Sequence, residues 1–104
     1  MAQYTLVDSH DGTELNLRAG DVVVLRLAEN PTTGYRWEIV AAQGFEMEAD
    51  DYSVTVAGGL GHGGERALRF RATTAGTARI EAVLRRSSET ASPRRRYSVS
   101  ANVR

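Results

Sequence analysis

Few side chains in this sequence could carry out catalysis or hold a metal ion. It contains no cysteine and no lysine, and its two histidines are His10 and His62. A cysteine nucleophile, a thiolate metal site and a catalytic or phosphate-binding lysine are therefore excluded. The histidines lack metal-ligand spacing, and Ser87, Ser88 and Ser92 stand near arginines rather than near a base. We expect neither an enzyme nor a protein with a metal or cofactor.

The first of three segments suited to binding is a tight loop, Asn30-Pro31-Thr32-Thr33-Gly34-Tyr35. Pro31 fixes its own φ and moves Asn30 out of the helical region. Gly34 permits a positive φ, and the Asn30 side chain can hydrogen-bond backbone further along the turn. These residues predict a stiff loop with two small hydroxyl side chains at its tip.

The second segment is a glycine-rich loop, residues 58–64, with five glycines in seven residues. A hairpin needs one or two glycines, so either this loop is mobile or its backbone approaches a partner closely. We expect Gly63 and Gly64 to need such an approach or a positive φ. No helix signature follows the loop, which disfavours phosphate binding.

The third segment, residues 85–96, carries five arginines. Across the whole chain, too, the acidic residues lie mainly in the first part and the arginines mainly in the second. Residues 1–65 hold 3 arginines and 11 acidic residues, whereas residues 66–104 hold 10 arginines and 2 acidic residues. Two interpretations stay open: neighbouring strands pair these charges, or the arginines form a patch for an acidic partner. Nucleic acid is a poorer partner, because an aromatic content of 7% offers few stacking platforms.

Short strands must position these loops, because apolar and polar residues alternate with period two through most of the chain. The run 22–27 is more continuously apolar and suits a central strand, while 41–51 fits either a strand or a short helix. We predict an all-β, immunoglobulin-like β-sandwich of about 7–8 antiparallel strands with Trp37 in its core. The alternating runs are residues 35–39, 68–71, 78–84 and 97–103.

The length of 104 residues fits a single domain that spans residues 1–104, and we expect a monomer. No apolar run approaches the ~18 residues of a membrane span, so no membrane partner is expected. The first residues lack the basic and apolar regions of a secretion signal. We therefore expect a cytoplasmic protein if Met1 is the native start, and otherwise the mature form of an exported one.

The three loops together resemble the signature of the chagasin-like inhibitors of cysteine peptidases, proteinase inhibitor family I42. That family carries an N-P-T-T-G-[YF] loop, then a G-x-G-G loop, then an R-P-W loop. Residues 30–35 match the first motif, and Gly61-His62-Gly63-Gly64 match the second. The third motif falls on Arg86-Ser87-Ser88, which keeps the arginine but lacks the proline and the tryptophan.

The resemblance implies an inhibitor of papain-like cysteine peptidases that blocks the active-site cleft with loops 30–35, 58–64 and 85–96. Thr32 and Thr33 would enter the catalytic groove, and Tyr35 would support their loop from below. Serine at position 88 cannot replace the contact area of a tryptophan, so we expect weaker inhibition than is usual in the family, with marked salt dependence. The alternative is a non-inhibitory β-sandwich that serves as a binding or adhesion module.

Overall fold

The structure, a computed structural model, describes residues 1–54, 63–86 and 93–104, apart from the side chain of Pro31. The described chain consists of β-strands and two single-turn 3-10 helices, η1 (Asp8–His10) and η2 (Pro31–Thr33). No helix in these ranges has the length and apolar character needed to cross a membrane. The strands are β1 (Gln3–Val7), β2 (Thr13–Leu17), β3 (Val22–Glu29), β4 (Tyr35–Gln43), β5 (Phe45–Val54), β6 (Gly64–Ala72), β7 (Gly76–Arg86) and β8 (Arg95–Val103).

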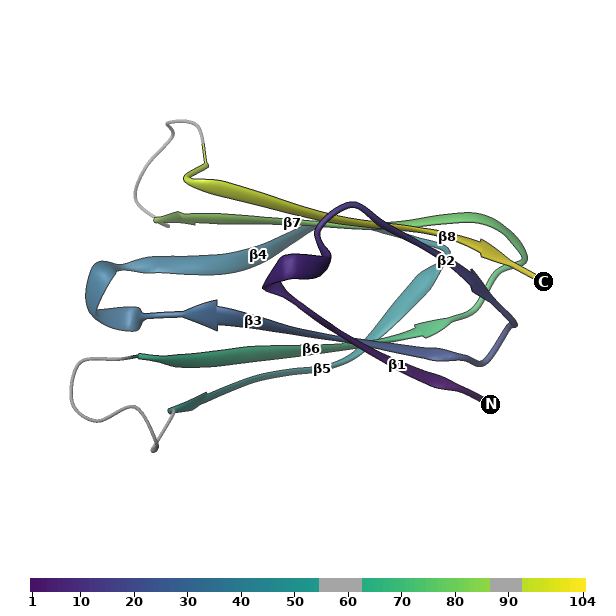
Figure 1. Cartoon of the computed structure of the whole chain (residues 1–104), viewed down its shortest axis with the longest axis horizontal. Helices are drawn as coiled ribbons and strands as arrows, with labels where there is room; N and C mark the ends of the chain where they lie inside the picture. The colour runs from purple at the N-terminus through teal and green to yellow at the C-terminus, as the bar shows by residue number, and fades with distance from the viewer. Residues whose placement is uncertain (55–62, 87–92) are drawn as a thin grey trace.

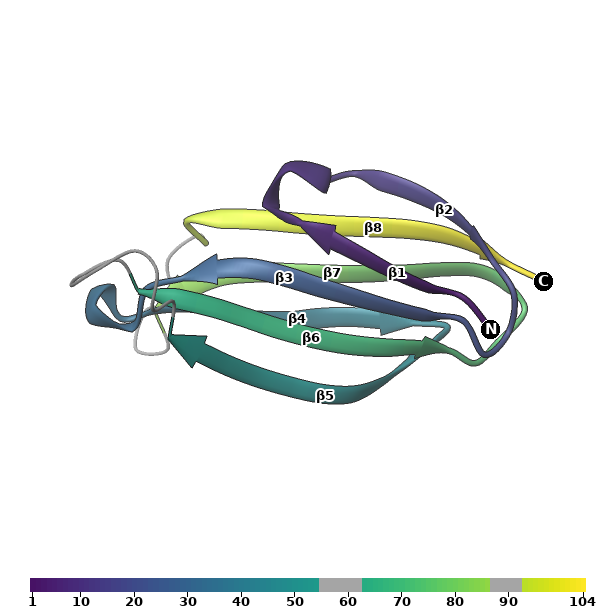
Figure 2. The same cartoon turned by 60° about the horizontal axis from the view of Figure 1, so that its bottom comes forward.

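Two four-stranded sheets pack face to face (Figures 1 and 2). Their strand orders are β1-β3-β6-β5 and β2-β8-β7-β4, which confirms the predicted all-β sandwich. The ambiguous region 41–51 is strand, divided between β4 and β5. Not every pairing is antiparallel as expected, because β1 pairs with β3, and β2 with β8, in parallel. Alternation could not reveal this, since side chains alternate between faces in both kinds of pairing.

The core between the sheets is formed by the inward-facing residues of the alternating runs. Trp37 is 4% exposed and meets Tyr97 edge to face, with 6.3 Å between ring centroids. Phe45 and Phe70 form a second edge-to-face pair at 6.2 Å. Trp37 also donates its indole N–H to the carbonyl oxygen of Ala28 at 2.9 Å. The predicted core position of Trp37 is therefore confirmed, and it anchors β4 close to the end of β3.

Ion pairs on the outer faces join acidic residues of the first half of the chain to arginines of the second. Arg71 contacts Glu46 at 2.9 Å and Glu48 at 3.2 Å, and Arg85 contacts Glu38 at 2.8 Å. These contacts confirm, for these pairs, the interpretation that neighbouring strands cancel the two charge excesses. Exposed pairs of this kind contribute little to stability individually.

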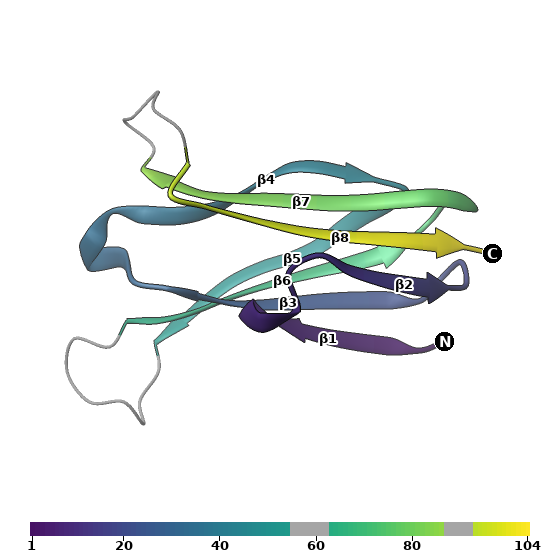
Figure 3. The same cartoon turned by 45° about the horizontal axis from the view of Figure 1, so that its top comes forward.

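The strands bring residues 30–35 and the described ends of the other two binding segments to one end of the sandwich (Figures 1 and 3). Residues 30–35 connect β3 to β4 there, β5 ends and β6 begins there, and β7 ends where β8 begins. Both chain termini lie at the opposite end. The end that carries residues 30–35 is called the loop end below.

Tyr97 provides a test of the packing between the sheets through its buried hydroxyl. The residue is 1% exposed, and its hydroxyl donates a hydrogen bond of 2.7 Å to the carbonyl oxygen of Val7. Burial, together with the negative charges of Asp11 and Asp8, raises the pKa of Tyr97 to about 12. The folded state therefore disfavours the phenolate more strongly than the unfolded state does.

We expect the free energy of unfolding to keep the Tyr97 contribution below pH 10 and to lose it as the pH rises towards 12. Tyr97→Phe should lower stability at pH 7 by about 1 kcal/mol, because a buried hydrogen bond is lost. The same variant should lose less stability than the parent between pH 9 and pH 12. Urea unfolding across this pH range tests both statements, with Tyr4→Phe as the control. Equal alkaline losses in parent and Tyr97→Phe would contradict them.

Candidate functional site

The loop at residues 30–35 is held by hydrogen bonds within itself. The Asn30 side-chain oxygen accepts from the Thr32 backbone N–H at 3.1 Å and from the Thr32 hydroxyl at 2.7 Å. The Thr33 hydroxyl donates to the Asn30 carbonyl oxygen at 2.7 Å. Gly34 has φ +79°, a conformation that residues with a side chain rarely adopt. The predicted Asn30 hydrogen bond and the positive φ of Gly34 are present, and both threonines are exposed at the tip of the loop.

A buried carboxylate lies directly beneath this loop. Glu29 is 4% exposed, and its carboxylate accepts hydrogen bonds from the Trp37 backbone N–H at 2.7 Å and from Arg66 Nη2 at 2.8 Å. Arg66, 8% exposed, also contacts Asp50 at 2.6 Å. The hydrogen bonds that Arg66 donates to Glu29 are the main reason why the pKa of Arg66 lies above its ordinary value. One ion pair thus joins the loop ends of β3, β4 and β6, and Arg66 extends it to β5.

Sequence reasoning missed Glu29 and Arg66, although a signal for both is present. In β3, Glu29 follows Leu25 and Leu27 at the alternate positions that face the core. In β6, Arg66 lies two residues before Leu68 and so also faces the core. A charged residue at an inward position is costly unless an opposite charge reaches it. Two such positions of opposite charge, each within two residues of a loop, indicate a buried ion pair.

The two described glycines of the second motif lie against neighbouring parts of this chain, so the close approach seen here is within the molecule and not to a partner. Gly63 has φ +68°, and a Cβ there would lie 2.8 Å from the Cβ of Asn30. A Cβ on Gly64 would overlap the Ser53 carbonyl oxygen and lie 2.6 Å from the Tyr52 hydroxyl. Gly63 therefore brings the end of the glycine-rich loop against the 30–35 loop, whereas Gly64 permits close packing with β5.

Arg86 supports the first loop from the neighbouring strand. It lies opposite Tyr35 in the β4–β7 pairing, and its Nε donates to the carbonyl oxygen of Thr33 at 3.1 Å. Its guanidinium carbon lies 4.8 Å from the centroid of the Tyr35 ring. Arg94 also approaches this ring, at 5.1 Å. The arginine kept from the third motif thus braces the loop, and Tyr35 lies beneath the loop with an arginine on its ring.

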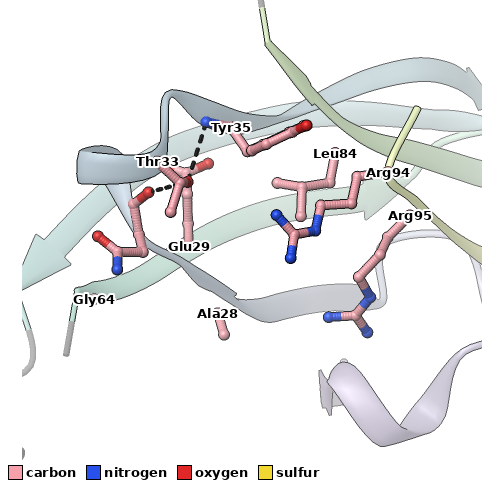
Figure 4. A pocket seen from close by; sticks show the side chains of 9 residues that line it. Ala28, Glu29, Thr33, Tyr35, Gly64, Leu84, Arg94 and Arg95 are labelled. Atoms are coloured by element: carbon pink, nitrogen blue, oxygen red, sulfur yellow. Dashed lines mark hydrogen bonds between the residues drawn. The ribbon is translucent and has the colours of Figure 1, made fainter. Parts of the chain in front are cut away.

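A pocket of about 280 Å³ opens at the loop end between the first loop, β6 and the start of β8 (Figure 4). The described part of the chain places no three acidic or histidine side chains where they could share a metal ion. The polar and charged side chains that line the pocket can bind a partner by hydrogen bonds and charge. The lining residues are Ala28, Glu29, Asn30, Thr33, Tyr35, Gly64, Leu84, Arg94 and Arg95.

The structure brings most of the predicted site residues together, and the rest lie outside the described ranges. Gly61, His62, Ser87 and Ser88 belong to the second group, as does the side chain of Pro31. The residues placed together at the loop end are Asn30, Thr32, Thr33, Gly34, Tyr35, Gly63, Gly64 and Arg86.

Solved structures similar to this one include inhibitors of cysteine proteases. The crystal structure of the cysteine protease inhibitor EhICP2 from Entamoeba histolytica matches with a TM-score of 0.90 and 26% identity, covering 100% of this chain and 97% of that one. The solution structure of amebosin matches at 0.82 and 25%, covering 98% of each chain. PbICP-C, solved in complex with falcipain-2, shares the fold at 0.58 and 14%, covering 98% of this chain and 89% of that one.

The sequence matches the model of a known family over most of its length, although no individual curated protein matches it. The model of the chagasin family of peptidase inhibitors, I42, matches residues 16–103, which include the first loop, the described glycines and Arg86. The protein therefore belongs to the chagasin family of peptidase inhibitors.

Proposed function

We propose that this protein inhibits papain-like cysteine peptidases by inserting the 30–35 loop into the active-site cleft, flanked by segments 58–64 and 85–96. The observation that carries the proposal is the exposed Thr32–Thr33 turn, which is hydrogen-bonded to Asn30 and seated on the buried Glu29–Arg66 pair. Family membership and the likeness to EhICP2, a cysteine protease inhibitor, support it. PbICP-C, a more distant relative in fold, was solved with falcipain-2.

The geometry of the loop suits a plug rather than a substrate. Small side chains at the tip allow a close approach to a recessed thiolate–imidazole pair. Asn30 and Gly34 hold the loop in one compact turn, so little conformational entropy should be lost on binding. A peptide bond in such a loop cannot extend along the groove as a substrate does, because the Asn30 hydrogen bonds hold it in a 3-10 turn.

Substitution at the loop tip tests this placement. Thr32→Asp and Thr33→Asp should each raise the inhibition constant against papain roughly tenfold or more, about 1.4 kcal/mol, because a charge would be buried without a partner. Thr74→Asp is the matched control, since Thr74 is exposed in the turn between β6 and β7 at the opposite end. Inhibition that stays at the parent level in both loop variants would refute the placement. Thermal unfolding of each variant verifies that it is folded.

The role of the buried pair beneath the loop calls for a second experiment. Glu29→Gln should lower the free energy of unfolding by about 3 kcal/mol, because Arg66 is left buried without its main counter-charge. Glu48→Gln, which removes an exposed carboxylate paired with Arg71, should change stability by less than about 1 kcal/mol. Urea unfolding measures both, and equal losses would contradict the assigned importance of the pair.

A double variant separates stability from loop positioning. Glu29→Gln combined with Arg66→Met removes both charges, while the glutamine oxygen can still accept from the Trp37 N–H. Stability should recover in part, as is usual when a buried pair is removed as a whole. Inhibition of papain should stay weakened, because the side-chain link from Glu29 through Arg66 to Asp50 is lost beneath the loops. Full recovery of inhibition together with stability would show that the pair serves folding alone.

A further inference from the structure

Three consecutive arginines lie at the start of β8, and the structure gives them different partners. Arg94 directly precedes the strand, and Arg95 and Arg96 are its first two residues. Arg95 lies 3.6 Å from the Asp8 carboxylate and 5.8 Å from the Trp37 ring centroid, and Arg96 lies 3.4 Å from Glu81. Arg94 forms no ion pair with any residue in the described ranges, and its ring contact is with Tyr35. Within those ranges, Arg94 is therefore the one of the three whose charge is not paired with a carboxylate.

The position of Arg94 is determined by the sheet. Its backbone N–H donates to the carbonyl oxygen of Leu84 at 2.8 Å, which fixes its backbone to the end of β7. Figure 4 shows its side chain extending from the start of β8 into the pocket that Tyr35 and Thr33 also line. The pocket thus presents a guanidinium group directly beside the base of the 30–35 loop.

Among the described residues, the pocket has no uncompensated negative charge of its own. Its one acidic lining residue is Glu29, whose carboxylate is already held by Arg66 and the Trp37 N–H. The other polar lining groups are those of Asn30, Thr33 and Tyr35 and the guanidinium of Arg95, which is paired with Asp8. A charged group that enters from outside therefore meets two arginines, a tyrosine ring and neutral hydrogen-bonding groups.

We propose that Arg94, which lies beside the Tyr35 ring, binds an aspartate or glutamate side chain on the rim of the target peptidase's cleft. The inference rests on the proposed function, because the pocket adjoins the loop that enters the cleft. A cation–π contact with a ring leaves the N–H groups of a guanidinium available for a bidentate carboxylate contact. Such a contact would select targets by charge, whereas the tryptophan that the third motif lacks would do so by apolar area.

This assignment has kinetic consequences. Attraction between a rim charge and its partner mainly speeds association and weakens as salt screens it. Peptidases with a carboxylate at this part of the rim should be inhibited faster and more strongly than those with a neutral or basic group there. Target choice within the papain-like class would then depend on one residue of each partner.

The test compares Arg94→Glu with Arg104→Glu. Arg104 is exposed at the opposite end and forms no ion pair in the described ranges, so the control changes net charge equally. Association and dissociation rates are measured at low and high salt with papain and other papain-like peptidases that the parent inhibits. We expect Arg94→Glu to raise the inhibition constant of at least one of them roughly tenfold, mostly at low salt, and Arg104→Glu by less than about twofold.

A charge exchange completes the test. In the peptidase most affected, each acidic residue on the cleft rim is changed to arginine in turn, and one such change should restore tight inhibition by Arg94→Glu. Equal effects of Arg94→Glu and Arg104→Glu throughout the panel, or no restoring exchange, would overturn the carboxylate site. A parent that inhibits no papain-like peptidase would instead refute the proposed function, so the two failures are distinguishable. Thermal unfolding confirms that both variants are folded.

Discussion

A buried ion pair between Glu29 and Arg66 joins four strands at the end of the sandwich where the apolar core stops. Taking both charges out of water is costly, and a well-packed apolar pair in the same place is often no less stable. An apolar pair, however, forms no directional hydrogen bonds. The Glu29 carboxylate accepts from the Trp37 backbone and from Arg66 at fixed angles, and Arg66 also reaches Asp50. The pair therefore sets where the strands stand as they enter and leave the loops.

The loops above this pair depend on each other as well as on the strands. Gly63 packs against Asn30 so closely that a Cβ would not fit without a shift, and Arg86 donates to the Thr33 carbonyl oxygen. The exposed turn of residues 30–35 is thus supported from two sides and from below. A surface prepared in this way loses little conformational entropy when it binds, which suits an inhibitor that must fit a cleft made by another protein.

The charge distribution follows from the same architecture. The chain has zero net charge but an acidic first half and a basic second half, and part of the two excesses is neutralised by pairing across β5 and β6 and across β4 and β7. Among the described residues, Arg94 is outside that pattern, because it stands just before β8, beside an aromatic ring instead of a carboxylate. Its lack of an ion pair within the described residues stands out because many of the other arginines have one.

The sequence alone was enough to predict most of the strands, the buried Trp37 and the hydrogen-bonded first loop, because these depend on local preferences: alternation, turn residues and the hydrogen-bonding habit of asparagine. It left residues 41–51 open between strand and helix and did not predict β1. It did not determine that β1 and β2 pair in parallel, or that Glu29 meets Arg66 across 37 residues. Nor did it show that Arg94, unlike Arg95 and Arg96, has no ion-pair partner among the described residues. Alternation reports which side chains share a face, whereas partners are chosen by which strands become neighbours, and only the tertiary structure decides that.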